Sequence, residues 1–110
     1  MADMTKDQEE KIEQLQLFEQ NLQGFLMQKH GLQSQLIEIE SALKELETTE
    51  VSYKIIGNIM VKAKKEDLKK DLMQKKEILD LKMKSLEKQE ERIKERAQKT
   101  QSEVLKEMKR

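Results

Sequence analysis

A chain of 110 residues has room for one domain at most, and its composition is unlike that of an ordinary globular domain. Only 35% of the residues are hydrophobic and 3% aromatic, whereas 40% are charged, so too few bulky side chains are present to enclose a conventional active-site pocket. The 22 basic and 22 acidic residues balance and proline is absent, which argues against disorder. This composition is typical of long helices.

The chain has no cysteine, which excludes a disulfide framework and a thiolate metal site and suits a reducing compartment. No apolar run approaches the roughly 20 residues that span a bilayer, and residues 1–10 are polar and acidic rather than signal-like. We therefore expect a soluble, unprocessed, cytoplasmic protein.

The first half of the chain carries a heptad stripe between Leu15 and Leu46, with apolar residues at alternating steps of three and four. Nine of the ten a and d positions are apolar, and Lys29 is the exception. Thr5 followed by Gln8 matches a capping box at a helix start. The pattern predicts a coiled-coil helix over residues 6–47.

A second, weaker stripe follows residue 65. Its d positions are Leu72, Leu79, Leu86, Ile93 and Thr100, and its a positions are Lys76, Met83, Glu90, Ala97 and Val104. Glu66 and Asp67 place acid in the first turn and Lys106 places base in the last turns, as the helix dipole favours. The sequence predicts a second helix over residues 65–108.

Residues 51–62 between the stripes are rich in β-branched side chains, and the period changes there from helical to alternating. Gly57 and Asn58 tolerate positive φ, so the segment predicts a β-hairpin with a two-residue turn. An irregular loop is the alternative, because a connection between helices needs only a few residues.

A tight turn at this point returns the second helix along the first, with facing residue numbers that sum to about 115. The facing pairs are then Leu43 with Leu72, Leu36 with Leu79, Leu32 with Met83, Leu22 with Ile93, and Phe18 with Ala97. Residues 1–50 carry a net charge of −7 and residues 51–110 a net charge of +7, which favours the same antiparallel pairing. The fold class is therefore a mainly α chain, an antiparallel two-helix coiled coil joined by a β-hairpin, and residues 1–110 form a single domain.

The hairpin is predicted to be an oligomerisation site, because an isolated two-stranded ribbon is marginal in water and has two open edges. We expect hairpins from several chains to combine into a larger sheet or barrel. The residues of this site are Val51, Tyr53, Ile55, Gly57, Asn58, Ile59 and Val61.

The free ends of the two helices are predicted to bind other proteins through apolar side chains. The seam weakens there, with Lys11 opposite Val104, so we expect the ends to fray and to leave apolar groups partly exposed. The candidate residues are Met1, Met4, Ile12, Leu15, Leu17, Val104, Leu105 and Met108.

The layout resembles the beta subunit of archaeal prefoldin over nearly the whole chain. The matching residues are Gln28-Lys29, Glu38, Ala42-Leu43, Glu45-Leu46, Tyr53-Lys54, Gly57-Asn58-Ile59 and the run from Leu86 to Arg92. The resemblance implies that four such chains join two alpha subunits in a hetero-hexamer whose hairpins build a β-barrel platform. It also implies that the coiled-coil tips grip unfolded client proteins, without ATP, and deliver them to a group II chaperonin.

Other features of the sequence have simpler interpretations. His30 has no carboxylates at metal-ligand spacing and is expected to be solvated, so no metal or other cofactor is predicted. Lys29 in the seam either sets the register or contacts another subunit. The basic stretch 62–70 is interrupted by acidic residues and lacks aromatic rings, which argues against nucleic acid as a partner. Nothing in the sequence suggests a membrane partner.

No catalytic constellation or phosphate-binding loop is found, so we do not expect an enzyme. The competing hypothesis is a structural coiled-coil scaffold or tether that dimerises through its helices. Such a scaffold has no need of an apolar hairpin and no affinity for unfolded chains.

Overall fold

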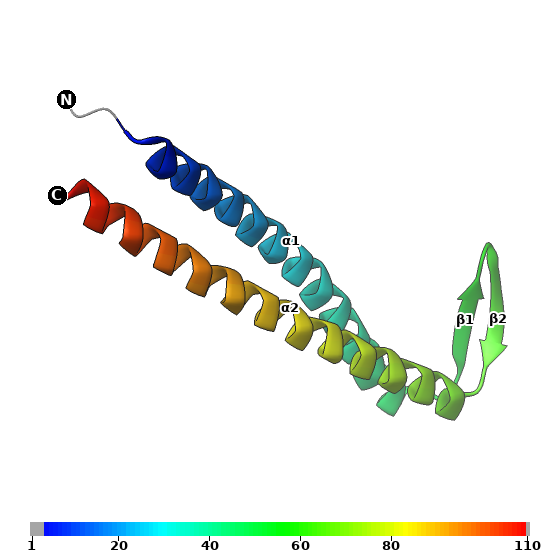
Figure 1. The fold of residues 1–110 in the computed structure, drawn as a ribbon. Helices are drawn as coiled ribbons and strands as arrows, with labels where there is room; N and C mark the ends of the chain where they lie inside the picture. Colours follow the sequence, from blue (N-terminus) through cyan, green and yellow to red (C-terminus); the bar gives the residue numbers. More distant parts are fainter. Residues whose placement is uncertain (1–3, 110) are drawn as a thin grey trace. The chain divides into compact units, whose positions relative to one another are not determined.

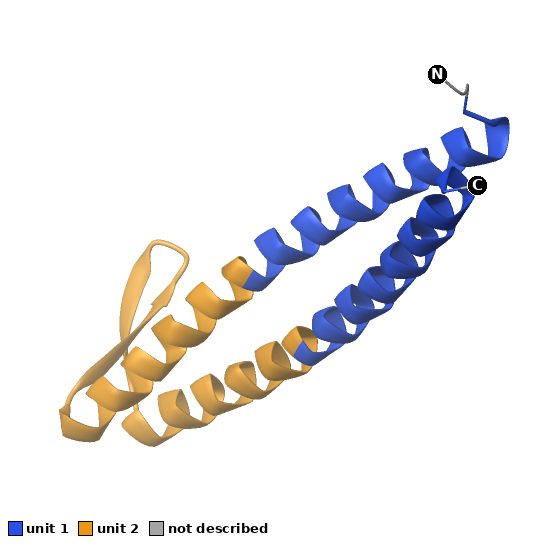
Figure 2. Ribbon diagram, turned by 90° about the vertical axis from the view of Figure 1, so that its left-hand side faces the viewer, with its two compact units in different colours: residues 1–29, 84–110 blue, residues 30–83 orange. Residues whose placement is uncertain are grey.

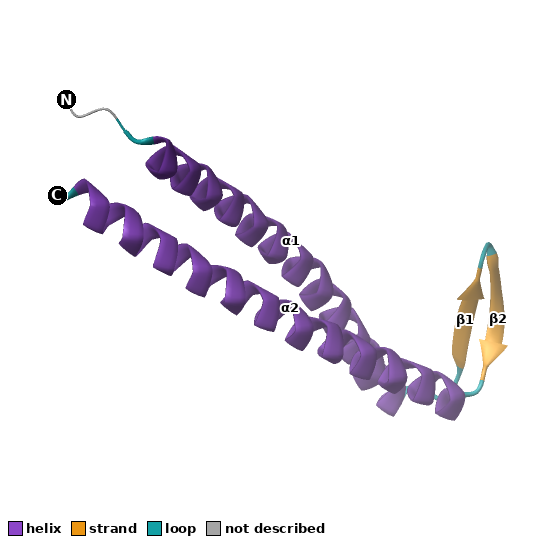
Figure 3. Ribbon diagram, viewed as in Figure 1, coloured by secondary structure: helices purple, strands orange, loops and turns teal. Residues whose placement is uncertain are grey.

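The computed structural model describes residues 4–109, which form two long helices and one β-hairpin (Figure 1). In chain order these are α1 (Lys6–Thr48), β1 (Ser52–Ile56), β2 (Ile59–Ala63) and α2 (Lys65–Met108) (Figure 3). The predicted helices and hairpin are confirmed, with their ends displaced by no more than one residue. The irregular loop is excluded by the ladder between β1 and β2.

The start of α1 is fixed by the capping box that the sequence predicts. The backbone N–H of Gln8 donates to Thr5 Oγ1 at 3.1 Å, and the backbone N–H of Thr5 donates to Gln8 Oε1 at 3.1 Å. This reciprocal pair satisfies two backbone donors that a helix start otherwise leaves free.

Side chains that follow α1 donate hydrogen bonds to backbone carbonyl groups at its end. Thr49 Oγ1 donates to the carbonyl oxygen of Glu45 at 2.7 Å, and Lys65 Nζ donates to that of Glu47 at 3.2 Å. The last turn of α1 contains no basic residue of its own, so Lys65 supplies the positive charge that a helix C-terminus favours. The contact ties the start of α2 to the end of α1.

The hairpin turns through Gly57 and Asn58. Gly57 takes a φ of 61°, whereas Asn58 keeps a negative φ, so only the glycine uses the left-handed region. Glycine at the first central position is typical of a type II′ turn, whose twist matches that of the strands. The ladder pairs Ile56 with Ile59 next to the turn and Ser52 with Ala63 at the base, where Ser52 Oγ also donates to the Ala63 carbonyl at 2.8 Å.

The chain divides into two compact units, shown in Figure 2. Within the described residues, the first unit contains residues 4–29 of the N-terminal part and 84–109 of the C-terminal part, and the second unit contains residues 30–83 with the hairpin. In each unit, a segment of α1 pairs with a segment of α2.

The seam between the paired helices consists of the a and d side chains of both stripes, which are buried or half-buried in each unit. Leu46 and Leu79 are the buried seam residues of the second unit, and Val104 is the buried seam residue of the first. Ion pairs between the helices agree with the predicted register. Lys76 Nζ lies 3.6 Å from Glu40 Oε1, one residue from the predicted partner position.

A cysteine pair tests this register and tests whether the two helices pair within one chain. Leu36→Cys and Leu79→Cys replace facing seam positions, whose Cα atoms lie within bridging range if the register is correct. We expect oxidation of this pair to give a monomeric species with faster mobility on a non-reducing gel. The control pairs Leu36→Cys with Leu86→Cys, which lies two helical turns out of register, and should give no such species. Crosslinked dimers as the sole product of the first pair would support the scaffold hypothesis instead.

Candidate hairpin and tip interfaces

The hairpin presents apolar side chains on both of its faces. The strand register places Tyr53, Ile55 and Met60 on one face and Ile56, Ile59 and Val61 on the other, because directly paired residues share a face. All six are exposed in the single chain. A strand pair that is apolar on both faces is typical of a sheet that is covered on both sides.

Two members of these faces, Ile56 and Met60, are absent from the set predicted from the sequence. Their exposed fractions are 57% and 65%, similar to those of the predicted residues. A two-residue turn fixes the pairing of the strands, so counting outward from Gly57 and Asn58 was the signal that could have found them. The predicted Val51, also exposed, lies just before β1 rather than within it.

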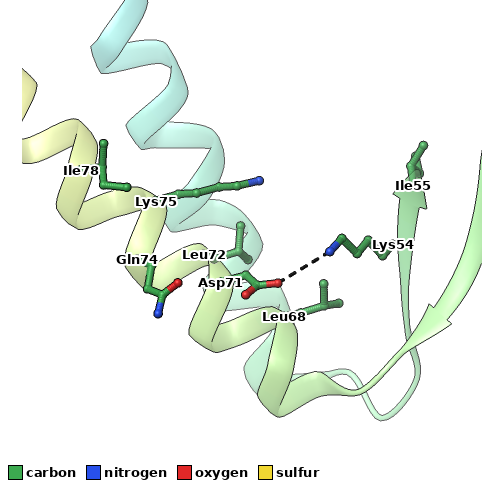
Figure 4. A pocket seen from close by; sticks show the side chains of 8 residues that line it. All are labelled: Lys54, Ile55, Leu68, Asp71, Leu72, Gln74, Lys75 and Ile78. Atoms are coloured by element: carbon green, nitrogen blue, oxygen red, sulfur yellow. Dashed lines mark ion pairs between the residues drawn. The ribbon is translucent and has the colours of Figure 1, made fainter. Parts of the chain in front are cut away.

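A groove of about 300 Å³ separates β1 from α2 in the second unit (Figure 4). Ile55 and Lys54 line it from the strand, and Leu68 and Leu72 line it from the helix. Lys54 Nζ lies 3.8 Å from Asp71 Oδ2 across it. Both side chains are half exposed, so this pair contributes no more than about 1 kcal/mol.

The second predicted site is the tip, which we define as residues 4–17 of the N-terminal part and residues 104–109 of the C-terminal part. Met4, Leu17, Leu105 and Met108 are exposed, and Leu105 has an exposed fraction of 51%. Ile12 and Leu15 are half-buried. Met1 lies outside the described residues.

The prediction that Val104 is partly exposed is wrong, because this side chain has an exposed fraction of only 6%. Lys11 forms ion pairs with Glu103 and Glu107, which flank Val104 on α2. These pairs join the two helices beside Val104, in a layer that the sequence suggested was open. In the sequence alone, Lys11 is a polar interruption of the heptad stripe, and its pairing with acidic residues of α2 depends on the packing of the two helices.

A second polar layer lies in the seam of the first unit. Lys29 Nζ and Lys94 Nζ each lie 3.4 Å from Glu90 Oε1, and the side chains of Lys29 and Glu90 are only 21% and 13% exposed. Partial burial raises the pKa of Glu90, but the hydrogen bonds and charges of Lys29 and Lys94 outweigh burial and hold this pKa below its ordinary value. The pairing supports a register-setting role for Lys29.

The polar layer predicts an acid-dependent loss of stability. Because the pKa of Glu90 is lower in the folded chain than in the unfolded chain, its ion pairs stabilise the fold above the unfolded value of about 4.3. This stabilisation is lost as the pH falls through the folded value. We expect Glu90→Gln to lower the thermal midpoint by roughly 2 to 5 °C at pH 7 and by much less at pH 3, as measured by circular dichroism.

The matched control for this prediction is Glu91→Gln, which changes an exposed neighbour. It should alter the midpoint little at either pH. A deficit of Glu90→Gln that is the same at pH 7 and pH 3 would show that the ion pairs do not provide the stabilisation.

The described residues contain neither a membrane-spanning helix nor a candidate metal centre. Neither α1 nor α2 is long and apolar enough to cross a membrane. Within residues 4–109, no group of three or more His, Cys, Asp and Glu side chains could hold a metal ion, and His30 is exposed. The chain therefore belongs to the class of antiparallel two-helix coiled coils that carry an apolar β-hairpin.

Known proteins share this design. The prefoldin subunit family model matches residues 9–110. A prefoldin subunit beta of Archaeoglobus fulgidus is 36% identical over 107 residues, covering 94% of this chain and 92% of that protein. Another, of Thermococcus onnurineus, is 38% identical over 96 residues, covering 81% of this chain and 83% of that protein.

A solved structure agrees with the sequence relatives. The crystal structure of the prefoldin beta subunit from Thermococcus strain KS-1 is similar with a TM-score of 0.89 at 29% identity, and 94% of each chain is covered. The chain belongs to the prefoldin family, and its similarity is to archaeal beta subunits. Membership of this family implies a chaperone role.

Proposed function

We propose that this chain is a subunit of an ATP-independent cytoplasmic chaperone that captures unfolded proteins at its coiled-coil tips and delivers them to a group II chaperonin. The observation that carries the proposal is the combination of helices that pair within one chain with a hairpin that leaves both apolar faces uncovered. Family membership assigns that combination to a chaperone subunit.

The proposed assembly is a hetero-hexamer of four such chains and two alpha subunits, in which the whole chain acts as one domain. Its platform consists of hairpins joined edge to edge. The open edges of β1 and β2 can extend a sheet, and neighbouring subunits can cover the two apolar faces. This accounts for apolar side chains that a single chain leaves in water.

The proposed binding of a client is weak at each tip and strong in the assembly. Leu17, Leu105 and Met108 offer exposed apolar groups, each providing about 1.5 to 3 kcal/mol if fully buried against a client and less in a loose contact. Several tips on one platform raise the effective concentration, and avidity can increase affinity by about 10² to 10⁴ without new contacts. Each individual contact remains easy to break when the client is handed over.

The scaffold hypothesis gains little support from the contacts. Lys29 with Glu90 and Glu40 with Lys76 join the two helices of the same chain, so the seam that a scaffold needs for dimerisation is already occupied. A scaffold also leaves the apolar hairpin faces without a role.

The test is suppression of aggregation. The chain is assembled with an archaeal alpha subunit and mixed, without nucleotide, with a chemically denatured client whose light scattering is followed. We expect near-complete protection at about one assembly per client molecule and transfer of the client to a group II chaperonin on its addition. Scattering identical to that with an equal mass of serum albumin would contradict the proposal.

A further inference from the structure

The tip of the first unit contains a cluster of charges centred on Lys11. Lys11 Nζ lies 2.6 Å from Glu107 Oε1 and 3.7 Å from Glu103 Oε2 on α2, and 3.1 Å from Asp7 Oδ2 on its own helix. One ammonium group therefore joins three carboxylates that come from both helices. The side chain is only 20% exposed.

Val104, which lies beside this cluster on α2, is buried. Val104 has an exposed fraction of 6%, the lowest among the buried residues of the described chain, although it lies only six positions from the C-terminal residue of the sequence. Its sequence neighbour Leu105 is 51% exposed. The last seam layer thus contains a charged residue, Lys11, at a d position, whereas most positions of the stripe are apolar.

The ion pairs of Lys11 are weak enough to break and form again. Exposed and half-exposed ion pairs are weak, and salt screens them, because the Debye length falls from about 10 Å at 0.1 M to about 3 Å at 1 M. Hydrogen bonds to Glu107 and then to Asp7 raise the pKa of Lys11, so the residue stays charged at any physiological pH. Ionic strength and competing charges, rather than deprotonation of Lys11, are therefore able to open the cluster.

We propose that Lys11 is a latch that holds the tip closed over Val104, and that opening the latch makes Val104 and the half-buried Leu15 available to apolar segments of an unfolded polypeptide. The exposed Leu105 and Met108 make the first contact, and the latch controls how much further apolar surface the client reaches. This inference rests on the proposed function, because it assigns a control to the same client site.

The latch itself is tested without a client. Gln14→Cys and Ser102→Cys place spin labels at exposed positions on the two helices, the first within the tip and the second two residues before it. In the assembly with an alpha subunit, we expect one narrow distance at 50 mM salt. Lys11→Glu, which places four carboxylates together, should broaden and lengthen that distance, and 1 M salt should shift the unsubstituted tip in the same direction.

The control for the distance measurement is Lys99→Glu, an identical charge change at an exposed residue of the same unit. It should leave the distance unchanged. A distribution that is the same in Lys11→Glu and Lys99→Glu would show that Lys11 does not hold the tip closed.

Client capture is expected to change in opposite directions in two variants of Lys11. Lys11→Glu opens the tip and should lower the concentration needed for half-protection of a denatured client by roughly two- to tenfold, the range that corresponds to losing weak ion pairs. Lys11→Leu completes the apolar seam and should raise that concentration to a similar extent. A shift in the same direction for both variants would overturn the latch.

The two hypotheses fail in different ways. If the unsubstituted assembly protects but both Lys11 variants protect equally well, the latch is wrong and the proposed function stands. If the unsubstituted assembly does not protect at all, the proposed function is wrong, and the spin-label distances alone decide whether Lys11 closes the tip.

Discussion

Replacing Ile55 and Val61 together with aspartate is expected to release monomers from the assembly while each chain stays helical. The two residues lie on opposite faces of the hairpin, so the double variant places a carboxylate on each face. Burying an uncompensated charge costs several kcal/mol, and this cost recurs in every copy of the chain. Native mass spectrometry with an alpha subunit should show loss of the hexamer, and circular dichroism should show little loss of helix.

Variants with a single substitution separate the two faces. Ile55→Asp and Val61→Asp should each weaken the assembly if both faces are covered, whereas only one will do so if a single face is covered. Ile37→Asp makes the same chemical change at an exposed apolar residue of α1 and should leave the hexamer intact. A double hairpin variant that retains the full hexamer would contradict assembly through the hairpin.

Deleting residues 1–12 and 104–110 is expected to abolish client protection without disturbing assembly. The deletion removes the exposed Leu105 and Met108 together with the latch, and it leaves the hairpin and most of the seam. Because protection depends on several weak contacts acting together, loss of these residues from every tip should raise the half-protecting concentration by at least about 100-fold. Light scattering of a denatured client measures the effect, and native mass spectrometry confirms the hexamer.

The control for the deletion removes apolar groups elsewhere. Ile78→Ser and Leu81→Ser replace two exposed apolar residues of the second unit, and this variant should protect as well as the unsubstituted assembly. Equal protection by the truncated and full-length assemblies would place the client site away from the tips.

The fold could be predicted closely because its determinants are local in the sequence. The three-four spacing of apolar residues fixes which side chains enter the seam, and each predicted a and d position is buried or half-buried. The capping box at Thr5 and the glycine turn at Gly57 act over two to four residues, so their outcome does not depend on distant packing.

The candidate sites were harder to predict because they depend on which side chains meet across helices and strands. Val104 was expected to be open because Lys11 interrupts the stripe, but the acids around Lys11 turn the interruption into a closure. Ile56 and Met60 are absent from the predicted hairpin site because the face on which each lies follows only from the strand register. Binding at the tip and assembly through the hairpin stay predictions, because both require partners.

Site-specific photocrosslinking tests the client site most directly. A benzophenone amino acid is placed at Leu105 in the tip or at Leu81, which is 62% exposed in the second unit, and each assembly is irradiated with a denatured, labelled client. The proposed function predicts strong crosslinks from Leu105 and at most trace crosslinks from Leu81. Crosslinks from Leu81 that equal or exceed those from Leu105 would contradict capture at the tips.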